Sequence, residues 1–84
     1  MEIQQFRYFL AAARYENLTK AAEDLHIAQP ALSQSIKRLE TELGISLFDR
    51  KNHRIELNEQ GKLLKKRLIP ILESIDNLKD ELWE

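Results

Sequence analysis

Residues 19–44, TKAAEDLHIAQPALSQSIKRLETELG, decide the fold, because they hold two helical segments separated by a short break. Ala21 and Ala22 are small enough for two helices to cross closely at this point. The break, residues 27–30, ends in Pro30, which suits the first turn of a new helix because no N–H is required there. A short helix, a tight turn and a second helix predict a helix-turn-helix.

The second helix of this motif has two faces. Leu32, Ile36, Leu39 and Leu43 recur at steps of four, three and four, so they form one apolar stripe that faces a core. Gly44 is expected to end the helix, since glycine adopts the left-handed conformation of a helix end without strain.

The opposite face of this helix is polar and carries short side chains near its N-terminal end. Glutamine can donate to and accept from adenine, serine can contact either base type, and alanine can meet a thymine methyl group. Lysine and arginine can neutralise phosphates. An ordinary solvated helix face has a similar composition, but within a helix-turn-helix we favour DNA contact. The candidate residues are Gln29, Pro30, Ala31, Ser33, Gln34, Lys37 and Arg38.

Upstream of the motif, the apolar spacing predicts an amphipathic helix over residues 2–15. Asn17 is expected to end it in the left-handed conformation. The next helix begins at Leu18 or Thr19 and ends near residues 25–26. We expect Thr19 to be the N-cap, and a helix end directed at DNA would also let Thr19 lie beside a phosphate.

Downstream, residues 45–48 and 54–57 have the pattern of short extended segments and predict a small two-stranded hairpin. The segment 49–54 between and beside them is basic, so it forms a candidate wing that contacts the DNA backbone or a narrow minor groove. A loop that is cationic only for solubility remains the alternative. The wing candidates are Arg50, Lys51, His53 and Arg54, with Arg54 ranked first and Arg50 also able to pair with an acidic neighbour.

The last segment predicts one helix from Asn58, an expected N-cap, to the end of the chain, roughly 40 Å long. Pro70 should bend it. Its apolar residues recur by four and three, which is typical of a coiled-coil seam that a second chain must cover. The predicted dimerisation residues are Leu64, Leu68, Ile71, Ile75, Leu78 and Leu82.

The charge of the 84-residue chain is distributed unevenly around a formal net charge of -1. Residues 45–67 carry seven cations and three anions, whereas residues 68–84 carry one cation and five anions. A polyanion would meet the basic block and not the average. This distribution permits nucleic-acid binding despite the acidic total.

Composition also excludes several classes of protein. The chain has no cysteine, and His26 and His53 lie far apart, so we expect no metal site and no cofactor. There is no glycine-rich phosphate loop and no nucleophile with a matching base, so we expect no enzyme. The N-terminus is not typical of a secretory leader, and no apolar run reaches the roughly 20 residues of a membrane span, so a soluble, cytoplasmic protein with no membrane partner is expected.

Over residues 2–61 the chain resembles the N-terminal domain of LysR-type transcriptional regulators. Each motif is weak alone, but together they are specific. They are Phe6 with Phe9 and Leu10, Ala21-Ala22 with Leu25, Gln29-Pro30-Ala31-Leu32-Ser33, Ile36 with Leu39-Glu40, Leu43-Gly44, Leu47-Phe48 with Arg50, and Leu57 with Gly61.

The resemblance implies a mainly α fold: a winged helix-turn-helix over residues 1–58 (three helices plus a two-stranded wing), then a linker helix over 59–84. It implies a homodimer, paired antiparallel through that helix, that binds double-stranded DNA and controls transcription in bacteria. By the family pattern Gln29, Pro30, Ser33 and Gln34 are base-reading positions and Arg54 a wing contact.

Two positions depart from the family, which usually has threonine where Asn58 stands and alanine where Gln60 stands. Asparagine can still cap a helix, so we expect no loss of function. Family members continue into an effector-sensing domain, so no inducer site and no tetramer contact is expected within these 84 residues.

A different class of function stays open at this point: a helical protein-interaction module that acts through the coiled-coil seam, with the basic block serving solubility only. A small DNA-packaging or antitoxin-like protein with little sequence preference is a third possibility. The operator sequence, the regulated pathway and the direction of regulation are not encoded in any residue pattern of this chain.

Overall fold

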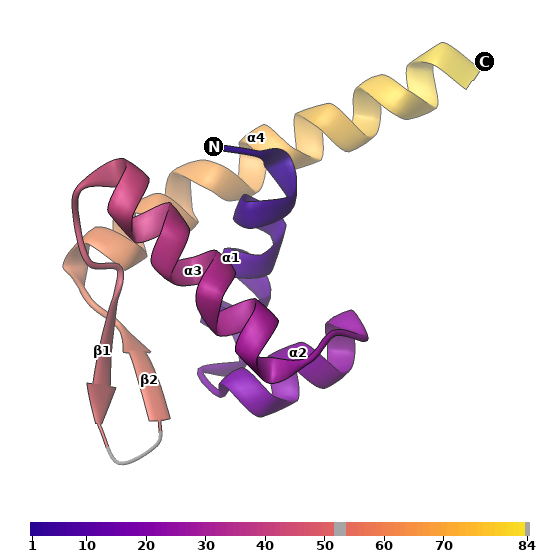
Figure 1. Ribbon diagram of the computed structural model, residues 1–84. Coiled ribbons are helices and arrows are strands. Elements are labelled where there is room, and N and C mark those ends of the chain that lie inside the picture. Colours follow the sequence, from indigo (N-terminus) through magenta and orange to yellow (C-terminus); the bar gives the residue numbers. More distant parts are fainter. Residues whose placement is uncertain (52–53, 84) are drawn as a thin grey trace.

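The computed structural model describes residues 1–51 and 54–83 as three helices, a hairpin and one long helix (Figure 1). In chain order these are α1 (Ile3–Tyr15), α2 (Leu18–Leu25), α3 (Gln29–Leu43), β1 (Phe48–Lys51), β2 (Arg54–Leu57) and α4 (Glu59–Trp83). The mainly helical, winged architecture expected from the sequence is confirmed. The molecule measures 48 × 26 × 19 Å, because α4 projects from the domain formed by the other elements.

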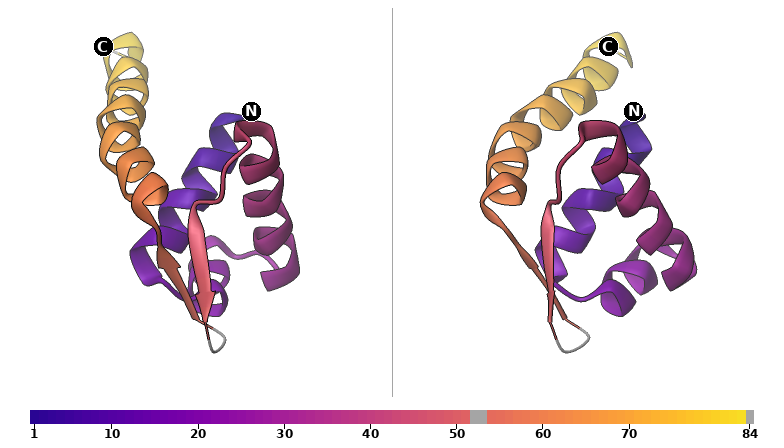
Figure 2. Two further views of the ribbon diagram at one scale, coloured as in Figure 1. Left: turned by 90° about the vertical axis from the view of Figure 1, so that its left-hand side faces the viewer. Right: turned by 60° about the vertical axis from the view of Figure 1, so that its left-hand side comes forward.

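The core lies where α1, α2 and α3 pack together, and β1, β2 and α4 close it from the other side (Figure 2). Phe9 of α1 is fully buried and its ring lies 5.5 Å from that of Phe48 in β1. Ala21 and Ala22 are also buried, as the close helix crossing requires. Leu32, Ile36 and Leu39 face this core, so the apolar stripe predicted for α3 is confirmed.

The junction between α1 and α2 differs from the sequence prediction. Glu16, and not Asn17, adopts the left-handed conformation, with φ of 49°. Asn17 is extended and is the N-cap of α2, where its Oδ1 accepts a hydrogen bond from the Lys20 N–H at 3.0 Å. The predicted cap at Thr19 is therefore wrong. An asparagine one residue before the helix can reach the free N–H groups, and α2 begins at Leu18.

Replacing Asn17 by alanine should lower the free energy of unfolding by about 1 kcal/mol, because the Lys20 N–H loses its side-chain acceptor. Replacing Thr19 by alanine should change it by less than about 0.5 kcal/mol, as for an exposed residue outside a cap. Thermal denaturation of the two variants gives the comparison, and a larger loss for Thr19 would contradict the assignment of the cap.

The remaining breaks follow the expected backbone rules. His26 is left-handed at the end of α2, with φ of 58°, and its backbone N–H donates to the carbonyl of Glu23 at 3.2 Å. Pro30 lies in the first turn of α3, and Gly44 ends α3 with φ of 72°. The helix-turn-helix predicted from residues 19–44 is thus confirmed at each of its boundaries except the first.

The first strand begins later than predicted. Residues 45–47 are not in a strand, because Leu47 is held at both backbone groups: its N–H donates to Glu40 Oε2 at 2.7 Å and its carbonyl accepts from the Asn58 N–H at 3.1 Å. The antiparallel register runs from the Phe48–Leu57 pair to the Lys51–Arg54 pair. Arg50 and Lys51 are therefore strand residues and not part of a loop.

Asn58 begins α4 as its N-cap, as predicted. Its Oδ1 accepts from the Gly61 N–H at 2.8 Å, and its side-chain amide donates to the Ser46 carbonyl at 2.8 Å. The asparagine thus caps α4 and also holds the loop that precedes β1. The helix continues through Pro70 to Trp83, and Figure 2 shows that its axis changes direction along its length.

The structure divides the predicted seam of α4. Leu68 is buried in the core of its own protomer, and Leu64 and Ile75 pack against the same core. These three residues are covered at least in part by their own chain, because α4 packs back on α1, where Arg7 pairs with Asp76 at 3.0 Å, and their role in dimerisation stays a prediction. The exposed apolar residues of the predicted seam are Ile71, Leu78 and Leu82.

Within residues 1–51 and 54–83, none of the helices has the length and apolar character needed to cross a membrane.

Candidate nucleic-acid interface

The outward face of α3 presents the residues that the sequence singled out. Pro30, Ala31 and Gln34 are exposed, as are Lys37 and Arg38 further along the helix. Gln29 and Ser33 are half-buried at the edge of this face. An exposed α-helix of about 10–12 Å diameter matches the width of the major groove of B-DNA.

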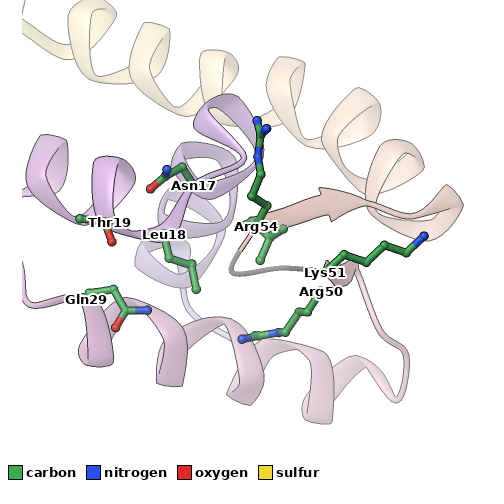
Figure 3. Close-up of a pocket in the computed structure, with 8 residues that line it drawn as sticks. Asn17, Leu18, Thr19, Gln29, Arg50, Lys51 and Arg54 are labelled. Carbon is green, nitrogen blue, oxygen red and sulfur yellow. The ribbon is translucent and has the colours of Figure 1, made fainter.

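An open groove of about 640 Å³ lies between the wing and the N-terminal ends of α2 and α3 (Figure 3). Five of the predicted site residues line it, although they are distant in sequence. Those five are Thr19, Gln29, Arg50, Lys51 and Arg54. The structure thus joins the helix-turn-helix and the wing into one surface.

The other predicted residues do not line this groove. Pro30, Ala31, Ser33, Gln34, Lys37 and Arg38 all belong to α3 beyond its first residue. His53 lies outside the described residues, so its predicted role as a wing contact stays a prediction.

Asn17 and Leu18 also line the groove but were not among the predicted site residues. The sequence pattern places Asn17 at the end of α1 and Leu18 only at the start of α2. The preference of asparagine for the N-cap position could have identified both residues. A cap at Asn17 predicts that α2 begins at Leu18, and the N-terminal end of α2 borders the groove.

The strand register assigns the wing cations to two faces. Arg50 pairs with Ile55, which is buried, so Arg50 lies on the inner face of the hairpin, whereas Lys51 and Arg54 pair on the outer face. Figure 3 shows the Arg50 side chain extending toward α3 and Arg54 extending away from it. Arg50 and Arg54 therefore point to opposite sides of the groove.

None of these three cations forms a salt bridge with another residue of the described ranges 1–51 and 54–83. The alternative that Arg50 pairs with an acidic neighbour has no support there, since its cross-strand partner is Ile55. The acidic residues Asp49 and Glu56 are cross-strand partners one pair further from the tip than Arg50 and Ile55. The positive charge of the wing therefore lies near its tip and is available to an anion.

The helix ends bordering the groove add to this potential. The N-terminus of a helix carries about half a positive charge, which favours an anion nearby. Asn17 caps α2, so the exposed Thr19 has no capping role. The N-cap of α3 is Ala28, which has no side-chain acceptor. The groove therefore combines three cationic side chains with two helix N-termini, an arrangement suited to a polyanion.

Shifted pKa values occur away from this surface. The Glu42 carboxylate accepts hydrogen bonds from the Met1 ammonium group and from Gln5, which lowers its pKa. The same contact with Glu42 raises the pKa of the Met1 ammonium group. This ion pair, with an N–O distance of 2.8 Å, joins the start of α1 to the C-terminal end of α3. In the part of the chain that the structure describes, no three His, Asp or Glu residues are grouped as a metal site would need.

Comparisons with known proteins agree with this geometry. Residues 3–62 match the family model for the bacterial regulatory helix-turn-helix protein, lysR family. The chain is 44% identical over 82 residues to an uncharacterized HTH-type transcriptional regulator of Bacillus subtilis, YybE. This match covers 98% of this chain and 28% of that protein. It is 41% identical over 78 residues to a probable cat1 operon transcriptional activator of Acinetobacter lwoffii, covering 93% of this chain and 26% of that protein.

Solved structures are similar as well. The DNA-binding domain of BenM in complex with benA site 1 DNA matches with a TM-score of 0.93 and 36% identity, over 98% of this chain and 95% of that one. The CbnR domain in complex with DNA matches with a TM-score of 0.91 and 34% identity, over 96% of this chain and 93% of that one. The chain thus spans between a quarter and a third of the length of these two curated relatives and nearly all of the two isolated domains. From the family match, these relatives and the shared fold, this chain belongs to the lysR family of bacterial regulatory helix-turn-helix proteins.

Proposed function

We propose that this chain is the sequence-specific, double-stranded DNA-binding part of a transcriptional regulator. The observation that carries the proposal is the single surface formed by the exposed face of α3 and the cationic groove beside it. In the proposed complex α3 lies in the major groove, where Gln29, Ser33 and Gln34 contact base edges. The similar BenM and CbnR domains were solved with DNA, which supports the same role here.

The wing holds the domain on the sugar-phosphate backbone. Arg50 lies on the inner side of the hairpin and contacts phosphates next to the segment read by α3. Lys51 and Arg54 lie on the outer side, and Arg54 enters the adjacent minor groove or follows its edge. Phosphate contacts of this kind fix the position on DNA, whereas the base contacts of α3 provide the specificity.

The proposed functional unit is a homodimer joined through α4. Ile71, Leu78 and Leu82 are exposed large apolar side chains on this helix, and pairing would remove them from water. A dimer would place two α3 helices on one side of the duplex. For successive major grooves they must lie roughly 34–36 Å apart, so the binding site is expected to contain two half-sites.

A duplex selected from random sequence tests the proposal by fluorescence anisotropy across a range of salt concentrations. The logarithm of the affinity should fall with the logarithm of salt concentration by about 0.9 for each phosphate contact. Replacing Arg54 by alanine should reduce this slope by about 1 and weaken binding to all duplexes to a similar degree. Replacing Lys79, which lies near the acidic end of α4, by alanine is the matched control and should leave the slope unchanged. A salt-independent affinity, or an unchanged slope for the Arg54 variant, would contradict the assignment.

A function as a protein-interaction module alone explains less of the structure. It does not explain why Arg50, Lys51 and Arg54 line a groove beside the N-termini of two helices. The family consists of regulators and not of enzymes, and we propose no catalytic role for this chain. As a regulator of bacterial DNA it would act in the cytoplasm.

A further inference from the structure

The chain enters the wing through residues 46–47, which lie between α3 and β1 and are held from two sides. On one side, Glu40 of α3 accepts through Oε2 from the Leu47 N–H at 2.7 Å and from the Ser46 hydroxyl at 3.4 Å. On the other side, the Asn58 side-chain amide donates to the Ser46 carbonyl at 2.8 Å, and the Asn58 N–H donates to the Leu47 carbonyl at 3.1 Å. The 46–47 segment is therefore fixed both to α3 and to the start of α4.

The direction of the wing relative to α3 depends on this segment. Within residues 1–51 and 54–83, no hydrogen bond or salt bridge joins β1 or β2 directly to α3. Phe48 and Ile55 hold the inner face of the hairpin in the core, but apolar packing is not directional. Beyond these residues the hairpin projects from the domain (Figure 1). The hydrogen bonds at residues 46–47 are therefore the directional connection between the wing and α3.

A small change of direction at the base of the wing becomes large at its tip. The Lys51–Arg54 pair lies four residues beyond Leu47, which is roughly 13 Å along an extended strand. A rotation of about 10° at Leu47 would move the tip by roughly 2 Å. A hydrogen bond formed at about 2.9 Å is already lost at about 3.6 Å. The long cationic side chains could follow this movement only by losing rotamer freedom, which lowers the affinity for DNA.

We propose that Glu40 and Asn58 are positioning residues for DNA recognition. They set the direction of the wing relative to α3, so that the wing cations meet phosphates while α3 contacts base edges. The proposal rests on the proposed function and deepens it. Neither residue lines the cationic groove, so each acts on DNA only through the 46–47 segment.

Asn58 has two separable roles in this arrangement, because its amide group carries an acceptor and donors. Its Oδ1 accepts from the Gly61 N–H and caps α4, whereas its NH₂ group donates to the Ser46 carbonyl. Aspartate is an equally good N-cap but has no donor. Asn58→Asp therefore keeps the start of α4 and releases the Ser46 carbonyl.

Fluorescence anisotropy of Glu40→Ala on the selected duplex tests the role of Glu40. The affinity should fall about tenfold, and the salt slope should become smaller by about 1–2, which corresponds to one or two lost phosphate contacts. The ratio of affinities for the selected duplex and for one with a base pair changed at α3 should stay at the wild-type value, because α3 is unaltered.

Glu42→Ala is the matched control for this variant. Glu42 also belongs to α3 and also accepts hydrogen bonds, but from Met1 and Gln5 and not from the wing. Its replacement changes the net charge by the same amount and should leave the salt slope unchanged. A Glu40→Ala slope equal to that of the control overturns the proposal. A lost preference between the two duplexes also overturns it, because α3 itself would then have moved.

Asn58→Asp tests the same segment from its other side without removing the cap. Its thermal stability should stay near that of the wild type, while the salt slope becomes smaller and the base preference is retained. Asn77→Asp makes the same chemical change at an exposed position of α4 and is the control for the added charge. Equal salt slopes for the two aspartate variants overturn the assignment of Asn58.

Hydrogen exchange of the free protein tests the 46–47 segment without DNA. The Leu47 N–H should exchange about tenfold faster in Glu40→Ala than in the wild type, because it loses its acceptor. An equal exchange rate overturns the proposal whatever the result with DNA. A wild-type chain without salt-dependent binding contradicts the proposed function and the positioning role with it. A wild-type chain that binds, with an unchanged slope in Glu40→Ala, contradicts the positioning role alone.

Discussion

Replacing Gly61 by alanine should lower the free energy of unfolding by about 3 kcal/mol, although Gly→Ala within a helix ordinarily raises it by up to about 1 kcal/mol. A Cβ at this position would overlap the carbonyl oxygen of Leu47 and lie 2.7 Å from Leu57 Cδ2. The Leu47 carbonyl cannot move away easily, since it accepts from the Asn58 N–H and its residue is fully buried. The first turn of α4 must therefore shift away from the hairpin.

The matched control is Gly44→Ala. Nothing lies within 4 Å of an added Cβ at Gly44, so its cost comes only from the left-handed backbone, with φ of 72°. That cost is about 1–2 kcal/mol. Urea denaturation of both variants should therefore give the larger loss for Gly61, and equal losses would show that crowding by Leu47 is not the cause.

Local patterns were sufficient to predict most of the fold. The steps of four and three in α3, the proline in its first turn and the glycine at its end all act within a few residues, and the structure confirms each. Errors arose where two residues could fill one role. Glu16 and Asn17 can both occupy the left-handed position, and only the hydrogen bond to the Lys20 N–H decides that Asn17 is the cap.

Tertiary contacts account for the other differences. The start of β1 depends on Glu40, which binds the Leu47 N–H from a helix whose position the sequence pattern does not give. The division of the α4 stripe depends on how α4 packs against α1, including the Arg7–Asp76 pair between residues 69 positions apart. A heptad pattern predicts that a side chain is buried, but it does not predict whether the same chain or a second chain buries it.

The candidate site shows the same limit. The cations of the wing and the polar face of α3 were predictable by residue type. That Arg50 lies on the opposite face of the hairpin from Lys51 and Arg54 follows only from the register. The groove that joins Thr19 and Gln29 to the wing requires the relative positions of three elements, and no periodicity contains them.

Replacing Ala31 by glutamate should weaken DNA binding on the order of a hundredfold and leave the fold intact. Ala31 is exposed on the outward face of α3, three residues after the N-cap Ala28. In the proposed complex the new carboxylate would lie in the major groove between two rows of phosphates, where like charges repel. In the free protein the same carboxylate would lie near the helix N-terminus, which stabilises a negative charge by about 0.3–1 kcal/mol.

The two effects have opposite signs, so the variant separates binding from stability. Asn77→Glu is the control: it changes the net charge by the same amount at an exposed position of α4. Anisotropy on the selected duplex should show near wild-type affinity for the Asn77 variant and a large loss for the Ala31 variant. Thermal denaturation should show that the Ala31 variant is at least as stable as the wild type. If the Ala31 variant bound DNA as tightly as the control, α3 would not be the helix that enters the major groove. A helix between the two DNA strands cannot carry an uncompensated carboxylate at its N-terminal end without a loss of affinity.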